Sequence, residues 1–294
     1  VNGNSEGFFY QYWYSYIDVD ANGGLGSVTD HTFIQDSLMY FVTSTKKSNG
    51  VDYWVVFRQA FGNGYLSYSL TEDGFDAENP VYSEAGDVYL NVPQFGRGGI
   101  SINPQGTLLA FAHEIEWDGN EVLYSGKLEL FHFDSESGMG GERIVKLDGT
   151  NTHINDIAAQ DSVFGAYGLA FSLDGEKLYF TKRGWVFQSN ISILDSAAIQ
   201  QSIVQFNTFL SPYGIAGLQL AKDGRLYIAS GSVASLGVIH QPNVAGLDAG
   251  FELIAVDLGG QNYSNQDLPN FDPSLFSSGF VVSNRCVNTE TSFS

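Results

Sequence analysis

The fold of this chain is decided by a stretch that reads Gly168-Leu169-Ala170-Phe171-Ser172-Leu173-Asp174-Gly175-Glu176-Lys177-Leu178-Tyr179-Phe180. Two other stretches align with it: residues 99–111, GISINPQGTLLAF, and residues 217–228, GLQLAKDGRLYI. All three contain a glycine, an alternating strand, a short turn that ends in glycine, and a second strand. A weaker copy covers residues 41–56. The chain therefore repeats one β-hairpin unit.

The spacing of these units predicts the architecture. The turn glycines Gly50, Gly106, Gly175 and Gly224 are 56, 69 and 49 residues apart. Each interval leaves room for a second hairpin, and four strands in a repeat of about 40–50 residues are typical of a β-propeller blade. We predict an all-β propeller of about five to seven four-stranded blades. It forms a single domain over residues 1–277, followed by a polar tail or the start of another module at 278–294.

The composition agrees with a β-rich chain. Aromatic residues make up 14% of the 294 residues, and aromatics favour pleated, half-buried surfaces. Asn-Gly and Asp-Gly pairs, which accept the positive φ of tight hairpin turns, recur along the first three quarters of the chain. Helical periodicity is rare, and the best candidate is a short helix within residues 195–204, with Asp195 or Ser196 as its N-cap.

The charge of the chain excludes several classes of partner. The formal net charge is −20, from 13 Lys and Arg against 33 Asp and Glu. Binding to nucleic-acid phosphates or to anionic lipid headgroups needs clustered cations, so we expect neither. No apolar run approaches the length of about 20 residues that a membrane-spanning helix needs. The single cysteine, Cys286, excludes an internal disulfide framework, and we interpret it as a thiol of the tail.

An ordered set of motifs runs through residues 12–276. It comprises residues 14–20 (YSYIDVD) leading into 22–28 (NGGLGSV), then 49–56 (NGVDYWVV), 101–106 (SINPQG), 130–138 (LFHFDSESG), 167–172 (YGLAFS), 217–229 (GLQLAKDGRLYIA) and 268–271 (LPNF). In this order the motifs resemble the propeller of large gliding-motility-associated surface proteins of Bacteroidota, which are typically cargo of type IX secretion. The resemblance implies a chain that is secreted or displayed on the outer cell surface.

The resemblance also has two departures. The family usually has further blades upstream of the NGGLG region, and downstream immunoglobulin-like modules with a C-terminal sorting domain. We therefore expect either part of a longer polypeptide or a divergent stand-alone member. The aromatic residues 8–17 predict a strand that needs neighbours. We expect it to close the ring by pairing near residues 251–256 or 280–282; the alternative is an open edge that another chain or further sequence covers.

One segment has half of a calcium-binding loop. Asp18, Asp20 and Asn22 place oxygen ligands at relative positions 1, 3 and 5, with Gly23 at position 6. Calcium takes six to eight oxygen ligands, and the carboxylate expected at position 12 is replaced by Thr29. The alternative is an acidic strand end that enters a glycine-rich hairpin. No other cofactor is expected.

The tryptophans and serines supply two further sets of candidate residues. Trp117 and Trp185 lie just beyond predicted strands and could bind a ligand by stacking, or could pack against a neighbouring blade; Trp54 is expected in the core. Ser37, Ser162 and Ser196 each follow an aspartate and precede an apolar residue, which fits the short O-glycosylation pattern of Bacteroidota. Glycosylation of these three serines would require the export that the resemblance implies.

No catalytic motif was found, and two functions are compared. The first is a non-enzymatic, exported propeller that binds a protein or glycan on a cell surface or serves a structural role, in adhesion or gliding-related assemblies. The alternative is a propeller hydrolase or lyase that acts on polysaccharide. Converging histidines and paired acids at the channel mouth would favour the enzyme. A channel lined by the glycines that begin each blade and by apolar residues would favour the binding module.

Overall fold

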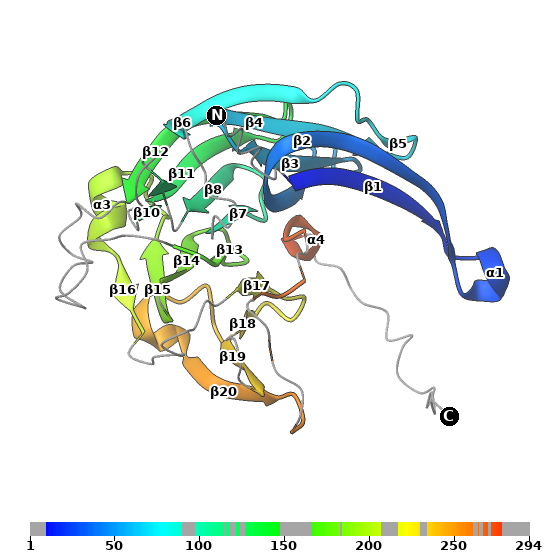
Figure 1. The fold of residues 1–294 in the computed structure, drawn as a ribbon. Helices are drawn as coiled ribbons and strands as arrows, with labels where there is room; N and C mark the ends of the chain where they lie inside the picture. The colour runs from blue at the N-terminus through cyan, green and yellow to red at the C-terminus, as the bar shows by residue number, and fades with distance from the viewer. Residues whose placement is uncertain are drawn as a thin grey trace, which may run out of the picture.

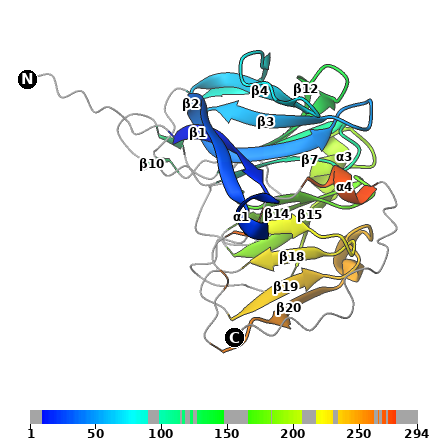
Figure 2. The ribbon, with the colours of Figure 1, turned by 90° about the vertical axis from the view of Figure 1, so that its right-hand side faces the viewer.

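The computed structural model describes residues 10–89, 98–113, 116–117, 122–123, 127–147, 166–182, 184–206, 217–229, 234–260, 264, 267–269 and 272–277. Apart from one two-stranded sheet, the described strands form four antiparallel sheets around a common centre (Figure 1), and in the side view the first, third and fourth of these lie one above another (Figure 2). Each sheet contains a four-stranded meander, which is the blade of a β-propeller. The predicted fold class is therefore confirmed.

The sheets follow one another along the chain. The first contains β1 (Tyr10–Asp18), β2 (Ser27–Lys46), β3 (Tyr53–Gln59), β4 (Gly62–Thr71), β5 (Gly74–Phe75) and β6 (Val81–Tyr89). The second contains β7 (Gly98–Ile102), β8 (Leu108–His113), β11 (Lys127–Asp134) and β12 (Met139–Leu147). A two-stranded sheet, β9 (Glu116–Trp117) and β10 (Val122–Leu123), lies between β8 and β11 in sequence.

The third sheet contains β13 (Leu169–Phe171), β14 (Lys177–Lys182), β15 (Trp185–Asn190) and β16 (Val204–Gln205). The fourth contains β17 (Leu218–Leu220), β18 (Leu226–Ala229), β19 (Ser235–Ile239) and β20 (Phe251–Asp257), with the 3₁₀ turn η1 (Gly246–Ala249) before β20. The described residues thus contain four blades, whereas the repeat led us to expect five to seven. The aromatic strand β1 does not begin a further blade, because it belongs to the first sheet.

The repeated glycines occupy equivalent turns. Gly50, Gly106, Gly175 and Gly224 each lie in the turn after the innermost strand of a different sheet, namely β2, β7, β13 and β17, with φ of 72°, 67°, 73° and 77°. In each turn the glycine amide donates a 2.9 Å hydrogen bond to the carbonyl three residues earlier. A positive φ is strained for residues with a Cβ, which explains why the repeat places glycine there. The alignment of the repeats is therefore confirmed.

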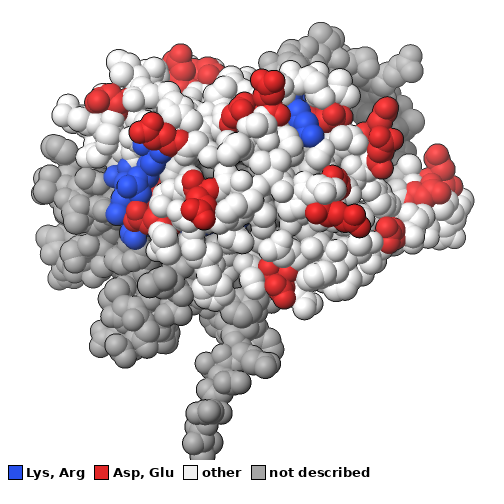
Figure 3. All heavy atoms as spheres, turned by 90° about the horizontal axis from the view of Figure 1, so that it is seen from above, with Lys and Arg blue, Asp and Glu red and all other residues white. Residues whose placement is uncertain are grey.

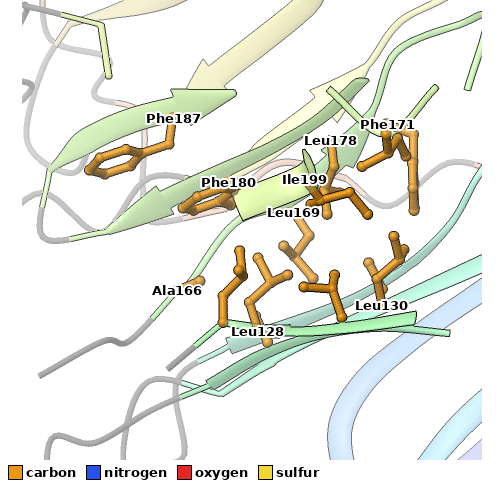
Figure 4. Close-up of a cluster of buried hydrophobic side chains, with 14 of the residues drawn as sticks. Leu128, Leu130, Ala166, Leu169, Phe171, Leu178, Phe180, Phe187 and Ile199 are labelled. Atoms are coloured by element: carbon orange, nitrogen blue, oxygen red, sulfur yellow. The ribbon is translucent and has the colours of Figure 1, made fainter. Parts of the chain in front are cut away.

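The hydrophobic core lies between adjacent sheets. Leu128 and Leu130 on β11 face Leu178 and Phe180 on β14, and Phe187 belongs to the same buried cluster (Figure 4). A second cluster joins the first and second sheets, and a third joins the third and fourth. Because each sheet buries residues on both faces, its central strands read as nearly continuous apolar runs.

The helices are short. The predicted helix is α3 (Ser196–Gln201), and the Asp195 carboxylate caps it by accepting a 2.9 Å hydrogen bond from the amide of Ala198. The other two helical segments are α1 (Ala21–Gly24) and α4 (Ser274–Ser277). Within the described part of the chain, no helix has the length and apolar character needed to cross a membrane.

The aromatic start does not pair as we expected. β1 pairs with the first half of β2, from Tyr10 opposite Leu38 to Asp18 opposite Ser27, and not with residues 251–256; the other expected partner, residues 280–282, lies outside the described part of the chain. Both strands leave the ring together, and α1 lies at the tip of their hairpin (Figure 1). The pairing is local because the loop between the two strands closes at little entropic cost, whereas pairing with residues 251–256 would close a far longer loop.

The C-terminal end of the described chain links the first and fourth blades. Ser274 Oγ accepts a 3.1 Å hydrogen bond from the amide of Lys46, at the end of β2. Phe276 packs against the core cluster of the third and fourth sheets. Residues 272–277 thereby place α4 near the centre of the ring (Figure 1).

Candidate functional site

The innermost strands of the four sheets surround a central pocket. β2 contacts β7, β7 contacts β13, and β13 contacts β17. The pocket has a volume of about 200 Å³ and is lined by residues 40–43, 98–101, 167–171 and 218–220, together with Asp267, Leu268 and Pro273. Each repeat contributes its first strand, so the pocket is the point where all four blades meet.

Glycine allows the inner strands to approach each other. A Cβ on Gly99, the first residue of its repeat, would lie 2.9 Å from the carbonyl oxygen of Tyr167 on the next blade. Real Cβ atoms essentially never come so close to backbone, so a side chain here would push the two blades apart. Gly168, which begins the next repeat, also lines the pocket. The recurring glycine at the start of a blade therefore follows from the crowding at the centre.

One carboxyl group lies at the pocket. Tyr167 donates a 3.4 Å hydrogen bond from its hydroxyl to Oδ2 of Asp267. Asp267 as a whole residue is exposed, but the pocket wall crowds its carboxyl group. This desolvation raises the pKa of Asp267, against the opposing effect of hydrogen bonds from the Leu268 amide and Tyr167. The pocket therefore combines one carboxylate with glycine backbone, apolar side chains and the neutral polar residues Thr43, Ser101 and Gln219.

The described lining of the pocket contains one carboxyl group. No histidine belongs to its described lining, and Asp267 is the single carboxylate there. Hydrolysis of a glycosidic bond by the usual route needs two carboxyl groups on opposite sides of that bond. A concave, largely apolar site with a few placed polar groups is instead the usual form of a small-ligand site.

His113 lies elsewhere, at the end of β8, and is fully buried. Burial lowers the pKa of its imidazole to about 3, and the positive charges of Arg58 and Lys127 act in the same direction. The ring is therefore neutral near pH 7. It belongs to the interior between the first two blades and does not reach the central pocket.

The calcium candidates lie at the distal end of the β1–β2 hairpin. Asp18 ends β1, and its Oδ1 accepts hydrogen bonds from the amides of Asp20 and Ala21 at 3.0 and 3.3 Å. Asn22 adopts a positive φ of 53°, as expected in a tight turn. All three predicted ligands are exposed. Across the described ranges, no group of three or more His, Cys, Asp or Glu side chains is placed to hold a metal ion. The arrangement matches the alternative of an acidic strand end that enters a hairpin, and calcium stays a prediction.

Of the two tryptophan candidates, Trp185 is not among the residues that line the pocket. Trp185 begins β15, is half-buried and packs against the core between the second and third sheets. This packing was the alternative to a ligand role. Trp117 lies in β9, but its side chain is outside the described part of the structure. Trp54 is buried in the core as predicted, and its Nε1 donates a 3.0 Å hydrogen bond to the carbonyl of Ser135.

The glycosylation candidates have three different positions. Ser37 is half-buried on β2, with an unusual positive φ of 59°. Ser196 is the first residue of α3, and its Oγ accepts a 3.2 Å hydrogen bond from Gln200. Ser162 and Cys286 lie outside the described residues. Glycosylation at these serines stays a prediction.

Sequence reasoning missed the residues of the pocket. None of the predicted ligand, metal or glycosylation residues whose side chains the structure describes lines it. Two signals could have located it: Gly99 and Gly168 begin aligned repeats, and Asp267 directly precedes the LPNF motif. In a propeller the first strand of each repeat is the inner one, so the start of the repeats marks the central pocket.

The comparisons with known proteins find similarity to solved structures. No protein-family model matches the chain, and no curated protein matches it by sequence. Among solved structures, a putative TolB from Agrobacterium tumefaciens has 14% identity and a TM-score of 0.37 over 71% of this chain and 60% of its own. A putative 6-phosphogluconolactonase from Bacteroides uniformis has 13% identity and a TM-score of 0.41 over 77% and 59%.

A third similar structure is the periplasmic gluconolactonase PpgL of Pseudomonas aeruginosa, with 15% identity and a TM-score of 0.36 over 79% of this chain and 78% of its own. The chain spans less than two thirds of the length of the first two structures. Fold and pocket together define a β-propeller with a central ligand-sized pocket. At these identities and TM-scores, no activity transfers to this chain.

Proposed function

We propose that this chain is a non-catalytic binding module that recognises a protein or glycan through the central pocket. The observation that carries the proposal is the pocket lining: glycine backbone, apolar side chains and neutral polar residues such as Gln219, with Asp267 as the single carboxylate and no histidine among the described lining residues. This is the arrangement that distinguishes the binding module from the polysaccharide hydrolase or lyase.

The resemblance to gliding-motility-associated surface proteins supports a location on the outer cell surface. A net charge of −20 keeps such a domain soluble and self-repelling. In Figure 3 the acidic side chains are scattered over the visible face, whereas most of the visible basic ones gather in one group. We therefore propose a role in adhesion or in a gliding-related assembly, with the pocket as the contact for the ligand.

The experiment uses the fluorescently labelled chain and intact bacterial cells as the source of ligand. Cells treated with periodate lose glycan epitopes, and cells treated with protease lose surface proteins, so the two treatments identify the ligand class. We expect binding of the chain to the cells to fall after one of the two treatments. We also expect the Tyr167→Ala variant to bind untreated cells about tenfold more weakly, because it lacks one aromatic side chain of the pocket wall. Tyr82→Ala is the matched control, because Tyr82 is exposed on β6 away from the pocket.

The enzymatic alternative has its own measurement. The chain is incubated with xylan, β-glucan, mannan and alginate, and new reducing ends and unsaturated products are measured. We expect no release above the buffer blank. Release that disappears in Asp267→Asn would refute the non-catalytic proposal.

A further inference from the structure

The β1–β2 hairpin exposes much of the apolar surface of this molecule. We call residues 13–33 the hairpin arm. Seven of the 17 large hydrophobic residues found exposed among the described residues lie in this short segment: Trp13, Tyr16, Ile17, Val19, Leu25, Val28 and Phe33. Soluble monomers rarely expose contiguous apolar patches, and such patches mark interaction sites. The arm projects from the ring, so the blades do not cover it (Figure 1).

One side of β1 packs against the first sheet. Tyr12 makes an edge contact with Phe57 at 4.9 Å between ring centroids, and its hydroxyl donates a 2.7 Å hydrogen bond to the carbonyl of Met39. Tyr14 contacts Phe75 at 5.1 Å, and the amide of Phe75 donates a 2.9 Å hydrogen bond to the hydroxyl of Tyr16. These contacts hold the hairpin in place.

Another group of aromatic rings on the hairpin is exposed. The indole of Trp13 stacks on the imidazole of His31 at 4.9 Å and 8°, and Phe33 meets Trp13 edge-on at 5.2 Å. Ser15 Oγ lies 2.8 Å from Nδ1 of His31. Trp13 and Phe33 remain 46% and 42% exposed. The arm therefore presents a preformed aromatic surface beside its edge strand.

The free edge of β1 is open to a further strand. β1 is the terminal strand of its sheet within the described structure, and the register is regular from Trp13 to Tyr16. Natural proteins block exposed edges with lysine, proline or short strands. β1 has nine residues and contains neither lysine nor proline. The pairing of β1 with β2 is irregular only before Trp13 and after Tyr16.

The negative charge of the arm indicates what charge a binding partner should carry. Asp18, Asp20 and Asp30 lie in the arm and Asp36 just beyond it, and the sequence has no lysine or arginine before Lys46. A second copy of the chain would bring the same aspartates and a net charge of −20, so pairing between two copies is opposed by repulsion. A strand with lysine or arginine side chains is complementary to this surface.

We propose that the free edge of β1 and the exposed aromatic surface of the hairpin arm dock an extended strand of another polypeptide that carries lysine or arginine side chains. The backbone of that strand pairs with β1, and its apolar side chains contact Trp13 and Phe33. This docking surface is separate from the central pocket.

The test uses the full chain and two labelled octapeptides, one alternating lysine with valine and one alternating glutamate with valine. Binding is followed by fluorescence anisotropy at two salt concentrations. We expect the lysine peptide to bind at least about tenfold more tightly than the glutamate peptide, and to bind more weakly at high salt. Amide hydrogen exchange should slow over residues 10–18 when the lysine peptide is added, and should stay unchanged over residues 251–257.

The chain offers a matched pair of variants. Ile17 on β1 and Ile254 on β20 are exposed isoleucines, at 63% and 67%, on terminal strands of two different sheets. Ile17→Lys should weaken binding of the lysine peptide about tenfold, because it places a like charge on the docking surface. Ile254→Lys should change it less than twofold. Trp13→Ala is a second test of the arm, and circular dichroism confirms that each variant folds.

Four results would overturn the proposal. The glutamate peptide could bind as tightly, or the protection could fall on residues 251–257. Sedimentation could reveal a dimer that Ile17→Lys dissociates, which would make a second copy the occupant. Binding could also appear only after residues 278–294 are deleted, which would make the tail of the same chain the occupant.

Discussion

Arg143 on β12 and Asp87 on β6 form an ion pair, with 2.6 Å between Nη1 and Oδ1, that joins the outer strands of the second and first blades. Lys127 and Lys146 also contact Asp87, at 3.0 and 2.8 Å, and Arg143 reaches the buried carboxylate of Glu129 at 2.7 Å. A chain with only 13 basic residues thus places three of them around one aspartate. This cluster joins the two blades in addition to hydrogen bonds between neutral groups, such as those from Trp54 Nε1 to the carbonyl of Ser135 and from Ser67 Oγ to the carbonyl of Gly138.

Replacing Asp87 should weaken the contact between these blades. Asp87→Asn keeps the shape of the side chain but leaves three cations without their shared anion, so we expect a loss of about 2 kcal/mol in the free energy of unfolding. Urea denaturation measures it. Glu176→Gln is the control, since its ion pair with Lys177 is 3.6 Å long and the glutamate is 56% exposed; it should change stability by less than about 0.5 kcal/mol. Equal effects from the two variants would contradict a special role for Asp87.

The contribution of Asp87 should depend on pH. Partial burial opposes its ionisation, but hydrogen bonds from Lys146, Arg143 and Lys127 outweigh burial and hold the pKa of Asp87 well below its usual range. Because the unfolded chain takes up this proton first, the stabilisation is complete above the unfolded pKa of about 4 and is lost as the pH falls below it. The difference in unfolding free energy between the wild type and Asp87→Asn should therefore shrink below pH 4. A difference that grows there would refute this account.

His113 should also make the stability of the fold depend on pH, over a higher pH range than Asp87 does. Burial lowers the pKa of its imidazole to about 3, whereas the unfolded chain protonates near 6.5. Between these values only the unfolded state binds the proton, so lowering the pH from 6.5 towards 3 should destabilise the fold by up to about 1.4 kcal/mol per pH unit. NMR should show a neutral His113 at pH 5, while exposed His132 serves as the internal reference. An imidazole that titrates near pH 6.5 would contradict the buried, neutral state.

Two turn glycines should differ in their tolerance of alanine. Gly50 and Gly106 have similar positive φ, but a Cβ on Gly50 meets nothing within 4 Å, whereas one on Gly106 would lie 3.0 Å from Oγ1 of Thr45. Gly50→Ala should cost about 1 kcal/mol of unfolding free energy from backbone strain alone. Gly106→Ala should cost more, because the first and second blades must also move apart. Thermal unfolding of both variants measures the difference. Equal losses of unfolding free energy would show that the first blade moves away from Gly106 at no energetic cost.

Much of the fold could be predicted from the sequence because its signals are local. The turns at Gly50, Gly106, Gly175 and Gly224 need a positive φ, which glycine supplies without help from distant residues. Asp195 caps α3 through an amide only three residues away. Repetition of the hairpin unit then implied blades, since each unit buries its faces only against another copy of itself.

The candidate site could not be predicted in the same way. Tyr167 and Asp267 are 100 residues apart, and only the arrangement of the blades brings them together at the pocket. The cluster around Asp87 likewise joins three strands of two sheets, and nothing in the spacing of Lys127, Arg143 and Lys146 points to one shared carboxylate.

The strand that pairs with β1 could not be predicted from the sequence either. Residues 8–17 were predicted to form an aromatic strand, but the choice between a neighbouring and a distant partner depends on competition among many possible pairings. The sequence by itself determined the strands, their turns and the repeated blade, because these depend on the conformational preferences of adjacent residues. Only the tertiary structure decided which strands meet, where the central pocket forms and which apolar face stays exposed, because these depend on packing between residues far apart in the chain.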